Sequence, residues 1–537
     1  GIRPIVITGI VTKLMEVPLN QELKQVLLNK AQLGFREKLG TELNILRLRT
    51  RAHQTLYENY DRKRKLKKIY ILFVDLKQAF DRVNQEILIK KLVKKNVKEE
   101  VINTLILLLN SGLISIDLIN RIRVNSGVGQ GKICSPLEFD IYIDDLLDMA
   151  EKECHTPLAF ADDTAFICSD MNQLIATTKT LEYWANENKI EINKKKSGIL
   201  IVNDDSADPN SIEGYSVVNE YKYLGILLDN KLNPKRHISS INAKLKTYLK
   251  RNKMLHKKFF TPFSLIRIAD YFVKSRLSYG LCCYIDNKVA MESIEKTLLR
   301  HLKSIFDLPE NTSHRRLQIV LGEPDLRVRL SIRLLKNWHK YKEHFEEEPE
   351  AVKKVLTTYF SEEELSNTPT TAQYEALKSD LINKNLCEKG NKEYLGVTLR
   401  NNHREFLKKY VFCYPDRRDF LVIKYFTRTC KLTNTRLFPQ CECGEDNTPE
   451  HAANSCTAKM NEVERKIHTK EFKDLFEKAM IDIGADNQLN DYLLWTMFKI
   501  EDNMERRAKI RQMIEKMKTV ITKLMIKPEE RKDYTEI

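Results

Sequence analysis

The sequence lacks any apolar run that approaches the roughly 18 residues needed to span a bilayer. Residues 1–5 also lack the basic start, the long apolar stretch and the small-residue cleavage site of a secretion signal or transit peptide. The 11 cysteines are odd in number and scattered, which without a secretion signal favours reduced thiols over a disulfide framework. We therefore expect a reducing, intracellular location and no membrane-spanning segment.

What the sequence does have is a surplus of basic residues. Lysine and arginine number 90 against 74 aspartates and glutamates, which leaves a formal charge of +16 and an isoelectric point near 9.1. Such a surplus points to a polyanionic partner, and we expect nucleic acid rather than a membrane surface. At 537 residues the chain is too long for one core and is expected to form three or four domains.

Two acidic sites occur beside predicted strands. The six β-prone residues 69–74 predict a strand buried on both faces, and Asp75 follows it directly, ahead of a helical pattern over 77–88. Further on, the apolar residues around Asp162 and Asp163 predict a β-hairpin with this acidic pair at its tip. Strands and helices mixed in this way predict an α/β or α+β core between about residues 60 and 235.

Carboxylates placed like this suit nucleotidyl transfer. Joining a nucleotide to a 3′ hydroxyl uses two divalent cations about 3.5 to 4 Å apart, and Mg²⁺ prefers carboxylate oxygens. Asp75 and Asp162 can supply these oxygens if their strands are neighbours, with Asp163 adding negative charge. The alternative is that the acidic pair is only favourable turn chemistry.

A glycine-rich segment, 127–131, lies between the two acidic sites. Its three glycines allow a backbone to approach a ligand closely, and Ser135-Pro136 predicts a helix with serine as its N-cap. We expect this segment to contact a template or a nucleotide.

Residues 238–257 predict an amphipathic helix, and 263–279 predict a second helix after Pro262. The basic face of the first helix either contacts nucleic-acid phosphates or is merely solvated. Its members are Lys246, Lys250, Lys253 and Lys257.

A cluster of cysteine and histidine near the C-terminus predicts one structural zinc ion. Thiolate and imidazole groups at short spacings suit tetrahedral Zn²⁺, although the first two cysteines are one residue closer together than usual. Unliganded cysteines are the alternative. The candidate ligands are Cys441, Cys443, His451 and Cys456.

The order of these motifs resembles the reverse transcriptases of non-LTR retrotransposons, which are right-hand polymerases with fingers, palm and thumb. The resemblance covers about residues 1–285, and Leu432 to Cys456 resemble the C-terminal zinc knuckle of insect-type elements. The family's palm motifs are matched by residues 73–81, 127–142, 160–163, 193–197 and 221–226, and its fingers motifs by residues 3–5 and 33–36.

The resemblance implies a role for each matched residue. Phe80 would be a steric gate that excludes a ribose 2′-hydroxyl, although without the resemblance a core phenylalanine is the favoured interpretation. Lys196 would protonate the leaving pyrophosphate, with Lys194 and Lys195 as adjacent alternatives. The remaining roles are Mg²⁺ binding by Asp75 and Asp162 with support from Asp163, nucleotide binding by Arg3, Gln130 and Gly131, and primer gripping by Leu224 and Gly225.

The chain departs from the family pattern at two positions near the expected nucleotide pocket. Gly129 stands where proline is usual and Lys132 where a small hydroxyl residue is common, which is expected to alter fidelity or activity. The chain also begins within the fingers, so we expect no N-terminal endonuclease in it. No ribonuclease H pattern of acids is evident between residues 300 and 430.

We therefore expect dNTP addition to a primer 3′ end, with an RNA template and a DNA target, as target-primed synthesis in the nucleus after a cytoplasmic ribonucleoprotein phase. Two alternatives remain: a domesticated polymerase that prefers DNA templates or adds untemplated nucleotides, and a non-catalytic RNA-binding scaffold derived from a retroelement. The expected domains are partial fingers (1–60), palm with inserted fingers helices (61–235), helical thumb (236–320), helical connection (321–430) with a polar linker near 355–375, zinc knuckle (431–460) and helical tail (461–537).

Overall fold

The computed structural model divides into two compact units. The first comprises Gly1–Ser239 with Lys336–Lys353, and the second Ser240–Leu335 with Lys354–Ile537. The first unit combines a sheet with helices, so the predicted α+β class is confirmed. The residues that the structure describes are 5–58, 68–110, 113–115, 121–123, 126–154, 156–203, 210–251, 262–306, 308–345, 350–393, 422–423, 470 and 507–525.

A six-stranded sheet with the order β4-β5-β1-β6-β8-β7 organises the first unit. Neighbouring strands run antiparallel except for β6 and β8, which are parallel. Two further strand pairs, β2–β3 and β9–β10, are separate from it. The strands are β1 (Ile69–Val74), β2 (Leu113–Ser115), β3 (Arg121–Arg123), β4 (Thr156–Phe160), β5 (Asp163–Cys168), β6 (Gly198–Val202), β7 (Ser211–Ile212), β8 (Tyr215–Val218), β9 (Glu220–Tyr223) and β10 (Ile226–Asp229).

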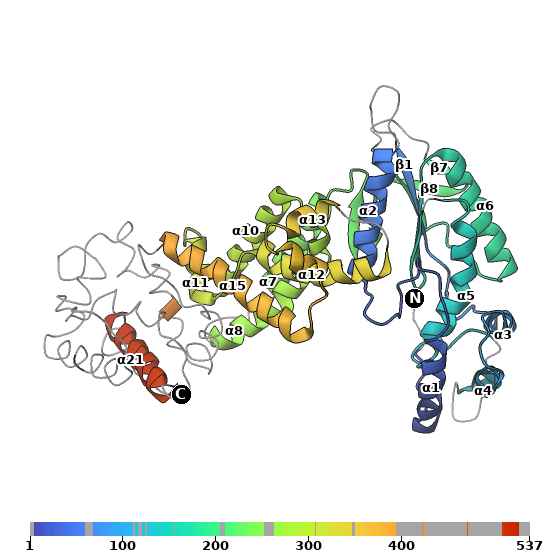
Figure 1. Ribbon diagram of the computed structural model, residues 1–537, viewed down its shortest axis with the longest axis horizontal. Helices are drawn as coiled ribbons and strands as arrows, with labels where there is room; N and C mark the ends of the chain where they lie inside the picture. Colours follow the sequence, from blue (N-terminus) through green and yellow to red (C-terminus); the bar gives the residue numbers. More distant parts are fainter. Residues whose placement is uncertain are drawn as a thin grey trace. The chain divides into compact units, whose positions relative to one another are not determined.

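Helices cover both faces of this sheet. Helix α2 lies on one side of β1, and α5 and α6 lie on the other (Figure 1). The helices of the first unit are α1 (Ile10–Leu23), α2 (Thr41–Glu58), α3 (Gln85–Lys94), α4 (Glu99–Asn110), α5 (Ser135–Ala150) and α6 (Met171–Glu187).

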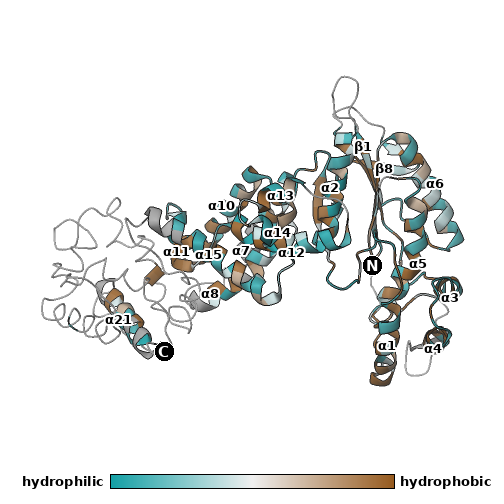
Figure 2. Ribbon diagram, viewed as in Figure 1, coloured by the Kyte–Doolittle hydropathy of each residue, from teal (hydrophilic) through white to brown (hydrophobic). Residues whose placement is uncertain are grey.

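Strand β1 is the centre of the core because it is apolar on both of its faces (Figure 2). Tyr70, Leu72 and Val74 belong to a buried cluster that also contains residues of α3, α4, α5 and α6. On the opposite face, the Phe73 ring stacks on Tyr221 with 4.3 Å between ring centroids. All six residues of β1 are buried, which confirms the strand predicted over 69–74.

The described part of the second unit is helical. The helix predicted over 263–279 is present but is interrupted by one π-helical segment, η1. Within the described ranges, no helix combines the length and the apolar character that a bilayer crossing requires. Three of the remaining helices, α7, α12 and α13, each contain a unit boundary. The remaining helices are α7 (Lys235–Arg251), α8 (Pro262–Ile268), η1 (Ala269–Lys274), α9 (Ser275–Ser278), η2 (Leu281–Tyr284), α10 (Lys288–Ile305), α11 (His314–Leu321), α12 (Leu326–His344), α13 (Glu350–Leu356), α14 (Glu362–Ser366), α15 (Thr371–Glu393) and α21 (Arg507–Met525).

The segment near 355–375, predicted as a polar linker, contains the short helix α14 and the start of α15. Some of its polar residues cap a helix. The Ser361 hydroxyl accepts a hydrogen bond from the Glu364 N–H at 3.2 Å, and the Glu364 carboxylate accepts one from the Ser361 N–H at 2.7 Å. This reciprocal capping box satisfies two backbone donors at the start of α14.

Candidate active site

Strand pairing brings the two predicted metal-binding carboxylates to one edge of the sheet. Strands β1 and β5 are antiparallel neighbours, and Val74 pairs with Thr164. Asp75, which follows β1, therefore lies near Asp162, which precedes β5. The condition set by the sequence, that the strands of the two acids be neighbours, is met.

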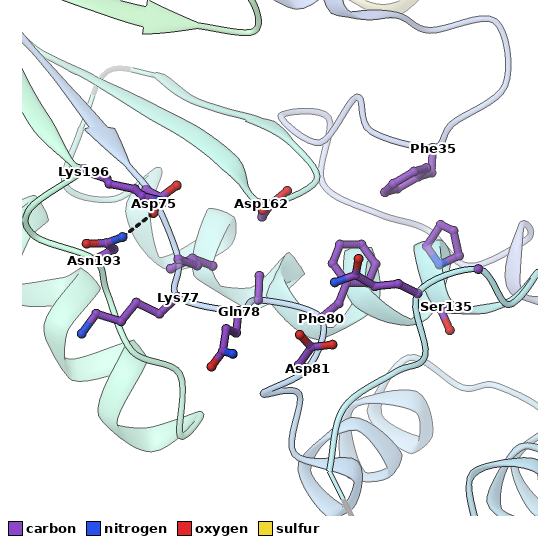
Figure 3. A pocket seen from close by; sticks show the side chains of 15 residues that line it. Phe35, Asp75, Lys77, Gln78, Phe80, Asp81, Ser135, Asp162, Asn193 and Lys196 are labelled. Carbon is purple, nitrogen blue, oxygen red and sulfur yellow. Dashed lines mark hydrogen bonds between the residues drawn. The ribbon is translucent and has the colours of Figure 1, made fainter. Parts of the chain in front are cut away.

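Asp75 and Asp162 both line a cavity of about 690 Å³ (Figure 3). This volume lies in the range of small-molecule sites, roughly 300 to 1,000 Å³. Its remaining walls come from the turn after β1, the glycine-rich segment, the start of α5 and the segment before β6. They comprise Phe35, Leu76, Lys77, Gln78, Ala79, Phe80, Asp81, Gln130, Gly131, Ser135, Pro136, Asn193 and Lys196.

Asp75 is held by the segment that leads into β6. The Asn193 side-chain amide donates to the Asp75 carboxylate at 2.8 Å, and the Asn193 backbone N–H donates to the Asp75 carbonyl at 2.8 Å. The Asp75 N–H in turn donates to the Ser197 hydroxyl at 3.0 Å. Sequence reasoning placed Asn193 and Ser197 in a family motif but gave them no role, and the structure shows that they orient Asp75.

The acidic hairpin differs from the prediction by one residue. Its tip consists of Ala161 and Asp162, whereas Asp163 begins β5 and pairs with Phe160. Ala161 has a backbone φ of 56°, which is left-handed and costs about 1 to 2 kcal/mol for a residue other than glycine. The turn that presents Asp162 is therefore strained, and its surroundings must hold it in place.

Asp163 is exposed and is not among the residues that line the cavity. Its charge acts instead on two tyrosines of β9, Tyr221 and Tyr223. Burial, together with the weaker effect of the Asp75 and Asp163 charges, raises the pKa of Tyr221 to about 12. Burial, followed by Asp163, raises the pKa of Tyr223 well above its usual value. Asp163 thus stands beside the two candidate metal-binding carboxylates without joining them in the cavity.

Phe80 belongs to both the core and the cavity wall. It is half-buried, and its ring stacks on Phe139 with centroids 4.5 Å apart and meets Phe35 edge-on at 6.3 Å. The helix predicted over 77–88 is wrong in its first half, where residues 77–82 form turns and α3 begins only at Gln85. Turns rather than a helix therefore place Phe80, so that its ring packs on Phe139 in the core and also lines the cavity.

The glycines of segment 127–131 make room mainly for the chain itself. A Cβ at Gly127 would lie 2.7 Å from the Asp81 carbonyl oxygen, and one at Gly131 would lie 2.8 Å from that of Val6. The Val6 N–H donates to the Gln130 carbonyl at 2.7 Å, so residues 5–6 run along this segment. The predicted close approach is made by protein backbone, while Gln130 and Gly131 still face the cavity.

The two departures from the family pattern are neighbours in space. A Cβ at Gly129 would lie 2.9 Å from a Val6 methyl group and 3.2 Å from Lys132 Cε. Glycine therefore leaves room here for the Lys132 stem and for Val6. Helix α5 also starts differently from the prediction: Cys134 is its N-cap, and Ser135 and Pro136 are its first residues.

Among the three adjacent lysines, only Lys196 lines the cavity. Lys194 forms an ion pair with Glu182 at 2.5 Å, and its ammonium lies 5.0 Å from the centroid of the Tyr215 ring. Lys195 is exposed. The position of Lys196 agrees with the choice made from the sequence, although its chemical role stays a prediction.

Leu224 and Gly225 form the turn of the β9–β10 hairpin. Both have a positive φ, 45° and 82°, which is the pattern of a type I′ turn. The Tyr223 hydroxyl donates to the Asn44 side-chain oxygen at 3.2 Å, and the Asn44 amide donates to the Ala159 carbonyl at 2.8 Å. The candidate primer grip is therefore tied to strand β4 of the hairpin that carries Asp162.

Several predicted site residues lie outside the described residues. Arg3, Lys253, Lys257 and the zinc candidates Cys441, Cys443, His451 and Cys456 belong to this group. Lys246 and Lys250 fall within α7, but their side chains are likewise not described.

The donor set of the cavity fits a hard divalent cation. Asp75 and Asp162 offer carboxylate oxygens, and Mg²⁺ sites usually complete their coordination with water and substrate phosphates. In the described part of the chain, the cavity included, no group of three or more histidine, cysteine, aspartate or glutamate residues could hold a metal ion.

Comparisons with known proteins agree with this geometry. Residues 1–228 match the family described as reverse transcriptase (RNA-dependent DNA polymerase). The chain is 28% identical over 368 residues to the RNA-directed DNA polymerase from mobile element jockey of Drosophila melanogaster, covering 61% of this chain and 37% of that protein. The same polymerase of Drosophila funebris is 29% identical over 243 residues, covering 41% and 25%. The chain therefore spans well under half the length of these curated relatives.

Among solved structures, the chain is similar to the telomerase of Candida albicans in complex with a fragment of telomeric RNA. The TM-score is 0.37 at 13% identity, covering 70% of this chain and 56% of that one.

Proposed function

We propose that this chain, whose residues 1–228 form a reverse transcriptase domain of the non-LTR retrotransposon class, adds dNTPs to a primer 3′ end on an RNA template. One observation carries the proposal: Asp75 and Asp162, from neighbouring strands, share a cavity with Phe80, Gln130 and Lys196. Carboxylates suit the Mg²⁺ that accompanies a dNTP, an aromatic wall can lie against its sugar, and a lysine can bind its phosphates.

The carboxylates would hold two Mg²⁺ ions. When bound, these ions lower the pKa of the primer hydroxyl and balance charge on the leaving pyrophosphate. Asn193 and Ser197 would keep Asp75 oriented toward the cavity, because both are hydrogen-bonded to it. Asp163 would add negative charge beside them.

The other walls of the cavity would bind and select the nucleotide. Phe80 would lie under the sugar and exclude a 2′-hydroxyl, since its ring is fixed by Phe139 and cannot easily withdraw. Gln130 and Gly131 would contact the incoming base pair, and Arg3 the triphosphate. Lys196 would donate a proton to the pyrophosphate.

The remainder of the chain would hold nucleic acid. Leu224 and Gly225 would grip the primer, and the lysines of the helix that starts at Lys235 would contact backbone phosphates without reading sequence. One structural zinc at Cys441, Cys443, His451 and Cys456 would form a knuckle for the element's RNA or its target DNA. The setting would be target-primed synthesis in the nucleus.

Primer extension on matched RNA and DNA templates tests the proposal. The purified chain is expected to extend a primer on RNA, and Asp162→Asn to abolish extension. Asp170→Asn is the matched control, because Asp170 caps helix α6 beyond the other end of β5, accepting from the Gln173 N–H at 3.0 Å. It should extend primers as the unmodified chain does.

Each alternative has its own result in this assay. Extension on DNA templates only, or untemplated addition, would indicate a domesticated polymerase. RNA binding without any extension would indicate a scaffold and would refute the polymerase proposal. Extension by Asp162→Asn equal to that of the unmodified chain would refute the assignment of the site.

A further inference from the structure

A buried glutamine lies behind the strained tip of the catalytic hairpin. Gln32 has no exposed surface. Its side-chain oxygen accepts hydrogen bonds from the Gly34 N–H at 2.8 Å and from the Ala161 N–H at 2.9 Å. Its side-chain nitrogen lies 3.5 Å from the Ala161 carbonyl oxygen. One amide therefore contacts both backbone polar groups of the residue that precedes Asp162.

The segment that carries Gln32 runs along the hairpin as a strap, defined here as residues 31–34. The Ala159 N–H donates to the Ala31 carbonyl at 2.9 Å, and the Leu33 N–H donates to the Ala159 carbonyl at 3.0 Å. The strap is thus fixed to β4 just before the tip. This fixation gives the Gln32 side chain a firm base from which to hold Ala161.

Gly34 brings the strap into direct contact with the tip. A Cβ at Gly34 would lie 2.4 Å from the Ala161 nitrogen and 2.9 Å from the Gln32 side-chain oxygen. No side chain fits in that space without moving backbone. The strap and the tip are therefore packed closely enough for Gln32 to restrict where Ala161 can lie.

Ala161 adopts its left-handed φ of 56° without being glycine. A strained residue keeps such a conformation only where its surroundings over-determine it. The contacts of Gln32 with the Ala161 N–H and carbonyl supply that restraint. Because Asp162 is the next residue, a rotation at Ala161 would swing its carboxylate away from Asp75.

We propose that Gln32 is a positioning residue that fixes the strained turn and so holds the Asp162 carboxylate at its place in the cavity. The inference rests on the proposed polymerase function. Gln32 does not line the cavity, so it acts on the metal site through Ala161 rather than by touching substrate. A displacement of about 1 Å at a catalytic group can lower a rate by about 100-fold.

Gln32→Met and Gln32→Glu separate positioning from simple packing. Methionine fills a similar volume but accepts no strong hydrogen bond, whereas glutamate keeps an oxygen that accepts from Gly34 and Ala161. Gln32→Met is expected to lower kcat about tenfold or more and to raise the Mg²⁺ concentration for half-maximal activity, with the KM for dNTP within about twofold of the parent. Gln32→Glu is expected to recover much of the lost kcat.

Gln173→Met is the matched control. The Gln173 side-chain oxygen also accepts from a backbone N–H, that of Ser169 at 2.9 Å, but beyond the opposite end of β5. This variant loses a comparable hydrogen bond far from the tip. It should keep the kcat and the Mg²⁺ dependence of the parent.

Mn²⁺ binding, followed by electron paramagnetic resonance, tests the inference without relying on activity. Gln32→Met is expected to weaken Mn²⁺ binding toward the level of Asp162→Asn, whereas Gln173→Met should match the parent. If the parent extended no primer, weakened Mn²⁺ binding by Gln32→Met would still support the positioning role while the polymerase proposal failed. Parent-like Mn²⁺ binding by Gln32→Met, or a kcat loss equal to that of Gln173→Met, would overturn it.

Discussion

Replacing Phe80 with valine distinguishes a steric gate from a core phenylalanine. The ring is half-buried and stacks on Phe139 at 4.5 Å, so its removal should lower the free energy of unfolding by about 2 kcal/mol. Forcing an extra hydroxyl against a packed ring costs about 1 to 3 kcal/mol, which corresponds to roughly 5- to 150-fold in rate. Phe80→Val should therefore raise the ratio of rNTP to dNTP incorporation about 10- to 100-fold.

Single-nucleotide extension with dNTP and rNTP measures this ratio directly, as kcat/KM for each substrate. Phe166→Leu is the control, because Phe166 is fully buried in the same core cluster and does not line the cavity. It should lower stability while leaving the ratio near that of the parent. A ratio unchanged in Phe80→Val, with stability lowered as calculated, would mean that Phe80 is only a core residue.

Four further predictions concern other parts of the chain. Lys196→Ala should slow nucleotide incorporation about 100-fold, as expected for the loss of a general acid. Lys194→Ala breaks the ion pair with Glu182 and should leave the rate near normal. Single-turnover kinetics measures both rates, and equal losses in the two variants would mean that the choice of lysine is wrong. Burial raises the pKa of Glu138 from 4.5 to about 7, so the folded chain holds this proton more tightly than the unfolded chain does. The free energy of unfolding should then fall as pH rises through that interval, and Glu138→Gln should remove the fall. Parallel urea titrations of the parent and the variant at about pH 5 and about pH 8 measure this difference. A fall that persists in the variant would mean that other groups cause the pH dependence. Gly225→Ala, at a φ of 82°, should destabilise the β9–β10 turn by about 1 to 2 kcal/mol and raise the KM for primer–template more than the KM for dNTP; the opposite split would remove this turn from the primer site. The purified chain should carry one zinc ion per molecule by elemental analysis and lose it on Cys441→Ser, and a metal-free parent chain would contradict the knuckle.

Local patterns were sufficient for many of the elements. The apolar run 69–74 forms the buried strand β1, and the apolar residues around Asp162 and Asp163 form the hairpin of β4 and β5. Such elements depend on side chains near in sequence, whose burial preference the sequence displays directly. Where the chain turns, local patterns did less well: residues 77–82, expected to be helical, form turns that hold Phe80 between Phe35 and Phe139.

The sequence by itself determined which chemical groups the chain carries: acidic residues beside strands, a basic surplus and, within residues 1–228, motifs that match the reverse transcriptase family. The tertiary structure decided which groups act together. It separated Asp163 from Asp75 and Asp162, turned Lys194 toward Glu182, and placed Asn193 and Gln32 behind the two carboxylates. These facts depend on contacts between residues far apart in the chain, 129 positions in the case of Gln32 and Ala161. Sequence spacing encodes the residues of one element, but only strand pairing and packing decide which elements meet.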